Sequence, residues 1–500
     1  MEQTTLKRGA GILLPVYALP SQYGIGTLGQ EALDFIDFLK ESGQKYWQVL
    51  PAGPTSIGDS PYQNYSAFAG NPYFIDLELL RQEGLLKKSN YEKRDWGGHP
   101  GYVDYGHMFE NRFKVLRIAF GNSKHMETEA YKKFEEDNAF WLDDYALFMA
   151  LKGYFEGSCW LDWKEDIRLH EEKAVAHYRK KLAYDIDFWK FVQFKFFEQW
   201  DKVKSYANEN GVEIIGDMPI YVALDSADTW VYYEQFQLDE GHNPEKVAGV
   251  PPDAFSDDGQ LWGNPLYNWD AMEKDGFTWW KNRMRTAAKL YDAVRIDHFI
   301  GIVRYYAIPA GSVNGMKGEF HWGPGKKLTD ALIEAAGETK IVAEDLGVII
   351  YEVRKLKAEA GFPGMKVLEF GFDSDEKNDY LPHNYEPNSI VYAGTHDNET
   401  LAGWLNHISG YTKEHLMDYL AIADEEEYEK TALDKVIRMA YGSVSSVAIM
   451  QMQDILGLGN EARTNEPSTM GYNWKWRLQP GQLTEKHAAY LKKLTVLYRR

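Results

Sequence analysis

The runs YDAVRID (Tyr291–Asp297) and KIVAED (Lys340–Asp345) each pass through an apolar, β-branched stretch and end in an acidic residue. Near-continuous apolar runs of this length are typical of strands that are buried on both faces of a parallel sheet. Six further runs have the same character, and they begin at Gly11, Tyr46, Val212, Met365, Ser389 and Ser445. The sequence therefore predicts eight buried strands, the first of which would cover residues 11–19.

Helical patterns separate these runs. Apolar residues recur at three- and four-residue steps at Leu28, Ala32, Phe35, Ile36 and Leu39, and again at Phe188, Val192, Phe196, Trp200 and Val203. A further helix is expected over VIIYEVRKLKAEAG, which ends at Gly361. Eight strands that alternate with helices predict an α/β fold of the (β/α)8 TIM-barrel type. On periodicity alone, an open doubly wound sheet is the alternative.

The chain, residues 1–500, is expected to form one catalytic barrel with two insertions. Residues 55–185 follow the second strand and are mostly helical and charged in pattern, which predicts an inserted helical subdomain. Residues 223–275 follow the third strand and are rich in Gly, Pro, Asp and Trp. Because long loops in compact domains are usually functional, we expect this second insertion to bind the substrate. Residues 452–500 leave no room for a C-terminal β-sandwich and end in a predicted helix.

Composition excludes several classes of protein. Lysine and arginine number 55 and aspartate and glutamate 75, so the net charge is −20, which disfavours nucleic acid as a partner. The single cysteine, Cys159, allows neither an intramolecular disulfide nor a thiolate metal cluster. No run reaches the roughly 18 apolar residues of a membrane span, and Pro15 and Pro20 interrupt the apolar N-terminal segment. We expect a cytoplasmic protein without signal peptide or membrane partner; the oligomeric state is not predicted.

A glycine-rich motif between the first strand and the first helix resembles a dinucleotide-binding loop. The segment GIGTLG (Gly24–Gly29) matches G-x-G-x-x-G. A dinucleotide site also requires an acidic residue at the end of the next strand, where this chain has Val49, Leu50 and Pro51. We therefore expect these glycines to shape a loop at the barrel mouth, and we expect no cofactor.

Acidic residues recur at the ends of the predicted strands: Asp217, Asp297, Glu344, Asp345, Glu369, Asp397 and Asp454. A single acid at such a place could cap the next helix. Six strands that end in this way would bring carboxylates together around one pocket, and like charges so close raise one another's pKa. The pattern therefore favours a functional site at the carboxyl ends of the strands.

Two kinds of chemistry use clustered carboxylates. The sequence has neither an HExxH motif nor an EF-hand loop, although a composite Mg²⁺ or Ca²⁺ site remains an alternative. Glycoside chemistry needs one ionised carboxylate as nucleophile and one protonated carboxylate as acid. Arg295 and Asp297 lie two apart on a strand and share a face, so the guanidinium is expected to keep Asp297 ionised. Glu344 has no basic neighbour, which suits a proton donor, but Asp345 remains open for that role.

These segments resemble a known family. AVRIDHF (Ala293–Phe299), IVAEDLG (Ile341–Gly347) and GTHDNET (Gly394–Thr400) look like the catalytic segments of the α-amylase clan. GDSPYQNYSAFAGNPYFIDL (Gly58–Leu77), GDMPIYV (Gly216–Val222) and VAGVPPDAFSDDGQLWGNPLYNW (Val247–Trp269) resemble the 4-α-glucanotransferases of the amylomaltase or disproportionating-enzyme type. The likeness extends from about Gly11 to Trp476, and the long Pro/Trp loop is its most specific part.

The resemblance implies a barrel enzyme without cofactor or metal that transfers parts of α-1,4-glucans, a glycosyltransferase of glycogen, starch or maltodextrin metabolism. It implies three catalytic residues: Asp297 as nucleophile, Glu344 as acid/base and Asp397 as transition-state stabiliser. It also implies five substrate-binding residues: Tyr62, Asp217, Trp262, Arg295 and His396. Among these, Tyr62 would stack on the sugar next to the scissile bond, and Trp262 would lie on the acceptor side.

The chain departs from the family pattern at two places. Ile57 stands where some relatives carry an aromatic residue that holds a distant part of a long glucan, which argues against such a second patch here. The late segment GNEARTNEPSTMGYNW (Gly459–Trp474) resembles a family loop, but the match around Asn465 stays open. Two other functions are weighed against transfer: an α-1,4-glucan hydrolase of the same clan, and a non-catalytic glucan-binding protein, for which the pairing of Arg295 with Asp297 would serve no purpose.

Overall fold

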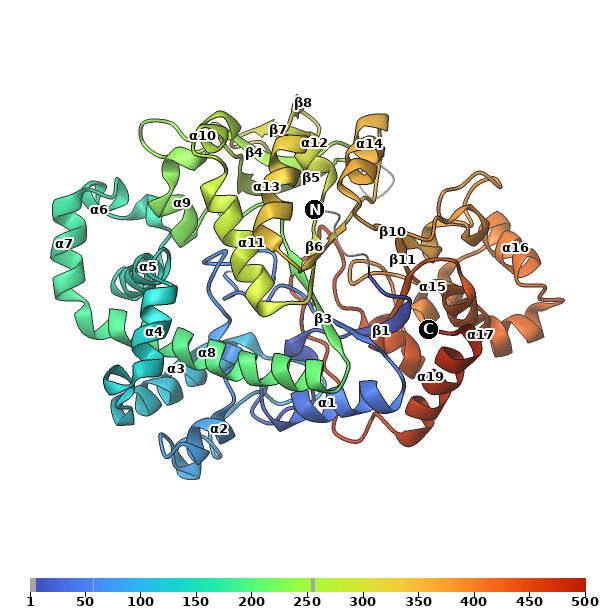
Figure 1. The fold of residues 1–500 in the computed structure, drawn as a ribbon, viewed down its shortest axis with the longest axis horizontal. Helices are drawn as coiled ribbons and strands as arrows, with labels where there is room; N and C mark the ends of the chain where they lie inside the picture. Colours follow the sequence, from blue (N-terminus) through green and yellow to red (C-terminus); the bar gives the residue numbers. More distant parts are fainter. Residues whose placement is uncertain (1–5, 57, 253–256) are drawn as a thin grey trace.

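A parallel barrel sheet forms the centre of the computed structural model, which describes residues 6–56, 58–252 and 257–500 (Figure 1). Its eight strands are, in order across the sheet, β10 (Gly364–Val367), β11 (Ser389–Tyr392), β12 (Val447–Gln451), β1 (Gly9–Leu13), β2 (Tyr46–Gln48), β3 (Glu213–Met218), β6 (Ala293–Ile296) and β9 (Lys340–Ala343). The two edges approach each other, because the Ala343 N–H donates to the Pro363 carbonyl just before β10, at 3.0 Å. The predicted barrel is confirmed, and the open doubly wound sheet is wrong.

The first strand is shorter than predicted. Strand β1 ends at Leu13, and a 3-10 helix, η1 (Val16–Ala18), follows Pro15. Proline lacks the backbone N–H that a central strand must donate to its neighbour, so the ladder cannot continue through this position. The prediction of a strand over residues 11–19 was therefore wrong in its second half.

The barrel interior is filled by side chains and is not a channel. Each of the eight strands contributes to one buried cluster: Leu13, Tyr46, Ile215, Ala293, Val342, Met365, Ile390, Tyr392, Val447 and Ile449. A second, larger cluster lies between the outer faces of the strands and the helices. Because both faces of the sheet are buried, the strands read as continuous apolar runs, and this is why the sequence revealed all eight.

Helices surround the sheet and form the outer layer of the barrel. They include α1 (Gln30–Glu41), α8 (Ala183–Glu209), α11 (Thr278–Leu290), α13 (Lys326–Ala336), α14 (Tyr351–Ala360), α15 (Leu401–His407), α16 (Gly410–Tyr419), α17 (Glu425–Gly442), α18 (Met452–Leu456) and α19 (Glu485–Tyr498). The predicted apolar faces of α1 and α8 are buried against the core. Helix α14 ends as predicted, because Gly361 adopts the left-handed conformation that glycine favours at a helix end. None of the helices in the described parts of the chain is both long and apolar enough to span a membrane.

The described part of the segment 55–185 is mostly helical. It holds α2 (Leu77–Gln82), α3 (Tyr105–Asn122), α4 (Glu129–Asp137), α5 (Leu142–Tyr154), α6 (Glu165–Arg168) and α7 (Glu172–Lys181). Asp76, Asp104 and Thr128 cap α2, α3 and α4 by accepting hydrogen bonds from backbone N–H groups of the first turn. These helices lie beside the barrel, and α8 leads the chain back into it (Figure 1).

A second, antiparallel sheet lies beside the barrel and was not predicted. It has the order β5 (Gln260–Pro265), β4 (Lys246–Val250), β7 (Arg304–Pro309) and β8 (Glu319–Trp322). Strands β4 and β5 belong to the segment 223–275, which also holds α9 (Ala227–Val231) and α10 (Trp269–Lys274), while β7 follows the short α12 (Ile300–Val303). The loop region expected over residues 223–275 thus contains two strands and two short α-helices. The segment contains two short strands that pair with each other, and β4 also pairs with β7, which comes from a later part of the chain.

Candidate active site

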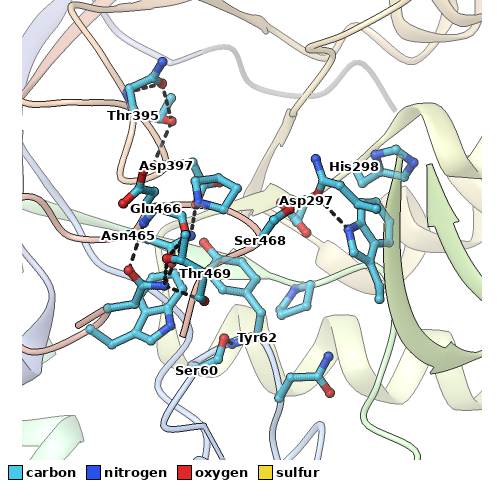
Figure 2. Close-up of a pocket in the computed structure, with 18 of the residues that line it drawn as sticks. Ser60, Tyr62, Asp297, His298, Thr395, Asp397, Asn465, Glu466, Ser468 and Thr469 are labelled. Carbon is cyan, nitrogen blue, oxygen red and sulfur yellow. Dashed lines mark hydrogen bonds between the residues drawn. The ribbon is translucent and has the colours of Figure 1, made fainter. Parts of the chain in front are cut away.

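A cavity of about 1010 Å³ opens at the carboxyl ends of the barrel strands (Figure 2). Its walls come from the ends of β6, β9, β10 and β11, from strand β5, and from two loops, residues 58–63 and 463–475. Six of the eight residues that the resemblance implies line it: Tyr62, Trp262, Arg295, Asp297, Glu344 and Asp397. The other two, Asp217 and His396, are almost fully buried behind the cavity wall and touch residues that line it.

Arg295 joins two carboxylates. Its Nη1 atom lies 2.8 and 2.7 Å from the two carboxylate oxygens of Asp217 and 3.1 Å from Oδ1 of Asp297. The side chain of Asp217 has no solvent exposure and that of Arg295 has 4%, whereas 26% of the Asp297 side chain faces the cavity. The buried carboxylate thus neutralises much of the guanidinium charge, and Asp297 is the partner that a ligand can reach.

The pKa of Asp297 differs from the sequence-based expectation. Burial raises it, and the neighbouring carboxylates Asp217 and Asp397 add to this, while Arg295 and His396 oppose them. The net shift is upward, because burial and the two neighbouring carboxylates outweigh Arg295 and His396. Arg295 therefore favours the ionised form of Asp297, as predicted, but it does not outweigh burial.

Glu344 lies on the neighbouring strand end, beside Asp297. Strands β6 and β9 are paired in parallel with Ile296 opposite Ala343, which places the next residues of the two strands side by side. The carboxylate of Glu344 accepts hydrogen bonds from the backbone N–H groups of His298, at 2.5 Å, and Leu346, at 2.8 Å. Burial raises its pKa to about 7 and the negative charge of Asp297 adds to this, while Arg295 and the two backbone hydrogen bonds oppose it. Glu344 therefore has the environment of a carboxyl group that keeps a proton near neutral pH.

The neighbouring acid, Asp345, points away from the cavity. Its two oxygens accept from Lys357 Nζ and from the backbone N–H of Met365, both at 2.8 Å. The structure thus separates the two candidates that the sequence left open. Asp454, another strand-end acid, is fully buried and accepts from the Leu401 N–H at 2.8 Å, so it supports a loop and lines no cavity wall.

Asp397 lies across the cavity in an environment that keeps it ionised. Asn465 Nδ2 donates to its Oδ1 at 2.6 Å, and His396 Nε2 lies 3.3 Å from its Oδ2. Partial burial would raise the pKa of Asp397, but the charge and hydrogen bond of His396 and the hydrogen bond of Asn465 lower it to about 2. Its charge in turn raises the pKa of His396 against the effect of burial. Asp397 and the protonated form of His396 therefore stabilise each other.

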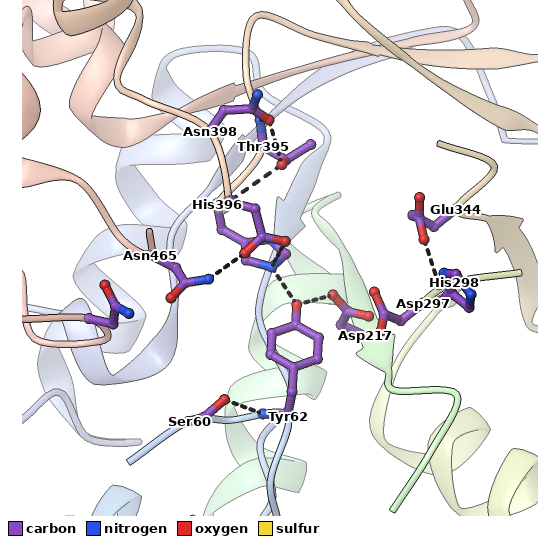
Figure 3. A network of polar contacts seen from close by, with 12 residues as sticks. Ser60, Tyr62, Asp217, Asp297, His298, Glu344, Thr395, His396, Asn398 and Asn465 are labelled. Atoms are coloured by element: carbon purple, nitrogen blue, oxygen red, sulfur yellow. Dashed lines mark hydrogen bonds and ion pairs between the residues drawn. The ribbon is translucent and has the colours of Figure 1, made fainter. Parts of the chain in front are cut away.

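Tyr62 connects the two sides of the site (Figure 3). Its hydroxyl lies 2.8 Å from Asp217 Oδ2 and 2.8 Å from His396 Nε2. Because Asp217 also binds Arg295, a continuous chain of polar contacts leads from Asp397 through His396, Tyr62 and Asp217 to Arg295 and Asp297. The rings of Tyr62 and His396 are stacked, with centroids 5.2 Å apart.

The opposite wall is aromatic. Trp262, on β5, lies edge-on to His298 with ring centroids 4.9 Å apart, and its indole N–H donates to Gln260 Oε1 at 3.0 Å. The second sheet therefore carries Trp262 to the cavity. Ile57, where the sequence argued against a further glucan patch, and residues 253–256 of the Pro/Trp loop lie outside the described residues.

Sequence reasoning missed the role of the segment 463–475. Asn465 binds Asp397, and Arg463 donates to the backbone oxygens of Asp397 and Asn465, both at 2.8 Å. Asn473 holds the loop closed by exchanging hydrogen bonds with Glu466. The only signal in the sequence was the likeness of this segment to a family loop, because no periodicity brings a loop 68 positions later in the chain to Asp397.

The arrangement presents three acids with different protonation preferences to one cavity. In the described parts of the chain, no group of three His, Cys, Asp or Glu side chains is placed to hold a metal ion. Asp297 and Glu344 lie side by side at adjacent strand ends, and Asp397 faces the same cavity with a lowered pKa. Such a set of carboxyl groups fits the cleavage of a glycosidic bond.

Comparison with known proteins agrees with this geometry. A family model described as 4-alpha-glucanotransferase matches residues 14–484. The chain is 46% identical to the 4-alpha-glucanotransferase of Clostridium butyricum over 487 residues, 97% of this chain and 99% of that protein. It is 46% identical to that of Thermus thermophilus, covering 97% of this chain and 98% of the relative. The solved amylomaltase from Streptococcus agalactiae in complex with acarbose superposes with a TM-score of 0.94 at 42% identity, covering 99% of this chain and all of that one. The chain belongs to the 4-alpha-glucanotransferase family.

Proposed function

We propose that this chain transfers a segment of an α-1,4-glucan to the 4-hydroxyl of another glucan or of glucose by a retaining double displacement. The observation that carries the proposal is the placement of Asp297 and Glu344 on adjacent strand ends, with Arg295 in contact with Asp297 alone of the two. Neighbouring strands are about 4.8 Å apart, close to the spacing of about 5–5.5 Å between the carboxyl groups of retaining enzymes. Inverting enzymes need room for a water between theirs.

In the first step, the Asp297 carboxylate attacks the anomeric carbon and forms a bond to it, while the bond to the glycosidic oxygen breaks. Glu344 gives its proton to that oxygen, and the shortened glucan leaves with a free 4-hydroxyl. In the second step, the 4-hydroxyl of an acceptor gives its proton to the Glu344 carboxylate, and its oxygen displaces Asp297 from the anomeric carbon. Both carboxyl groups then return to their starting states.

The binding residues have matching assignments. The ionised Asp397, held by His396 and Asn465, would accept hydrogen bonds from sugar hydroxyls and stabilise the positive charge on the ring. The Tyr62 ring would stack on that sugar, while Asp217 would act through Arg295 and Tyr62. Trp262 would face the acceptor. The single Cys159 suits a reducing compartment, and we place the enzyme in the cytoplasm on that ground.

A hydrolase would use the same two carboxyl groups, because water can replace the acceptor hydroxyl in the second step. The family match favours transfer. Incubation with pure maltotriose distinguishes the two: a transferase produces glucose together with oligomers longer than the substrate, and a hydrolase produces only shorter sugars. A product mixture without longer oligomers would refute the transfer reaction.

The nucleophile is tested by Asp297→Asn, with the exposed Asp418→Asn as the matched control. We expect turnover of maltotriose to fall on the order of 10⁴-fold or more, as in other enzymes that lose a nucleophile, while glucan binding measured by calorimetry persists. The control should retain wild-type turnover. Substantial activity in Asp297→Asn would show that another group attacks the sugar.

A further inference from the structure

Glu369 is a cavity-lining acid that the proposed mechanism does not use. It follows strand β10, in the 3-10 helix η7 (Leu368–Phe370), and its backbone N–H donates to the Ala393 carbonyl at 3.1 Å. The residue is only 8% exposed, although it contributes to the wall of the cavity. Its carboxyl group therefore reaches the site from the strand next to the one that leads to Asp397.

The carboxyl group of Glu369 is buried with few hydrogen-bond donors around it. Within the described residues, the buried oxygen Oε1 has no hydrogen-bond partner. A side chain on Gly394 would place its Cβ 2.5 Å from this oxygen, so the carboxyl lies tightly against the backbone of the β11 end. Asn398 lies against the same glycine, and its side chain lowers the pKa of the carboxyl. A carboxylate buried with so few donors would be strongly disfavoured relative to its neutral form.

The charged groups around Glu369 act in the same direction. Burial raises the pKa of Glu369 well above its ordinary value of 4.5, the negative charges of Asp454 and Glu399 add to the shift, and Arg463 opposes it. Arg463 is already engaged, because its guanidinium donates to the backbone oxygens of Asp397 and Asn465. No cation in the described chain lies within ion-pair distance of Glu369.

The contacts of Asn398 lead from Glu369 to Asp397. The Oδ1 atom of Asn398 accepts from the backbone N–H and the hydroxyl of Thr395, at 2.9 and 2.8 Å. The Thr395 hydroxyl oxygen in turn accepts from the Asp397 N–H at 3.3 Å. Thr395 therefore holds the amide oxygen of Asn398 in place. The same contacts hold the turn that presents Asp397 to the cavity.

We propose that Glu369 works as a neutral carboxylic acid that positions the Thr395–Asn398 turn, and through it Asp397, for the transfer reaction. The inference rests on the proposed function of Asp397. Glu369 is a positioning residue: it does not take part in the proton transfers of Glu344, and its proton stays in place through the catalytic cycle. A negative charge at this position would harm both the fold and the site.

Two substitutions separate a neutral from an ionised role. Glu369→Leu removes the polar group at similar volume, and we expect kcat on maltotriose to fall about 100-fold with KM changed less than about threefold, because the turn loses its position. Glu369→Gln keeps a neutral polar group, so its kcat should be at least about tenfold higher than that of Glu369→Leu. Exposed Glu414→Gln is the matched control and should behave as the wild type.

Thermal unfolding at several pH values gives an independent measurement. A carboxyl whose pKa is raised in the folded state stabilises the fold fully below its unfolded pKa, and this stabilisation is lost as the pH rises towards the folded pKa. The Tm of Glu369→Gln minus that of the wild type should therefore increase from pH 4.5 to pH 8, whereas Glu414→Gln should show no such trend.

The opposite result would overturn the inference. If Glu369 works as a carboxylate, Glu369→Gln should be as inactive as Glu369→Leu and should melt below the wild type at neutral pH. Equal, undiminished kcat in both variants would show that Glu369 positions nothing. Failure of the proposed function would give a different result, because the wild-type enzyme would then make no oligomers longer than maltotriose. The Tm comparison would still report on Glu369 in that case.

Discussion

Replacing Arg295 by Met tests the electrostatic centre of the site. In the wild type, Arg295 lies within 2.8 Å of both oxygens of Asp217 and 3.1 Å from Asp297, and it is almost completely buried. Without it, the unexposed carboxylate of Asp217 keeps the Tyr62 hydroxyl as its partner but has no counter-charge. Removing one member of a buried ion pair usually costs about 3–5 kcal/mol of unfolding free energy.

That cost corresponds to a modest change in melting temperature, because the protein is large. At about 2.1 cal/mol/K per residue, the unfolding entropy of the 500-residue chain is about 1 kcal/mol/K. We therefore expect Arg295→Met to lower Tm by about 3–5 °C, measured by differential scanning calorimetry. The double variant Arg295→Met/Asp217→Asn removes both charges and should recover more than half of the loss, since the penalty arises from the unpaired charge.

Activity gives a second readout of the same change. Because Arg295 opposes the effect of burial on Asp297, its removal should raise the pKa of Asp297 further and move the acidic limb of the kcat/KM profile to higher pH. Arg295→Lys keeps a charge and should show a smaller displacement. The reasoning would be refuted by an Arg295→Met variant that melts within about 1 °C of the wild type, by a double variant no more stable than the single one, or by an acidic limb that moves to lower pH.

Two other substitutions test neighbouring groups. Glu344→Gln removes the proton donor, so kcat should fall by about 10²–10⁴-fold and the alkaline limb of the pH profile, which reports loss of the Glu344 proton, should disappear; an alkaline limb that persists in the variant would contradict the assignment. Tyr62→Phe keeps the ring but removes the hydroxyl between Asp217 and His396, so we expect a loss of about 1.5–3 kcal/mol in unfolding free energy, measured by urea denaturation, and a lower kcat with little change in KM. A rise in KM with unchanged kcat would contradict this expectation, because it would mean that the hydroxyl acts in substrate binding and not in turnover.

The fold could be predicted from the sequence where burial is two-sided. All eight barrel strands have buried residues on both faces, and their runs are largely apolar, as at Val294 and Val342, with only a few polar residues such as Arg295. The antiparallel sheet could not be predicted in this way. In β8 all four residues are at least partly exposed, and β5 contains Gly263 in a left-handed conformation, so neither strand has an uninterrupted apolar pattern.

Strand ends were visible in the sequence, but the directions of the side chains were not. Side chains alternate between the two faces within a strand, but this alternation is lost where the strand ends. The sequence therefore does not show which of Glu344 and Asp345 points into the cavity. In the structure, Lys357 of helix α14 binds Asp345 away from it. The sequence likewise does not show the direction of the Asp217 side chain, which lies behind the cavity wall and binds Arg295 there. Contacts from distant segments, such as that of Asn465 with Asp397, leave no periodic signal at all.

The balance of charges around the cavity connects the catalytic cycle with the inference about Glu369. Asp217 and Asp297 share Arg295, and Asp397 pairs with His396. In the described chain, Glu344 and Glu369 have no cation within ion-pair distance, although both are mostly buried. Burial without a paired counter-charge raises the pKa of both carboxyl groups. Glu344 accepts from backbone N–H groups beside Asp297, and in the proposed mechanism it gives its proton to the leaving oxygen and regains one from the acceptor. Glu369 lies against the β11 backbone without such an exchange partner, so its proton serves position and not catalysis.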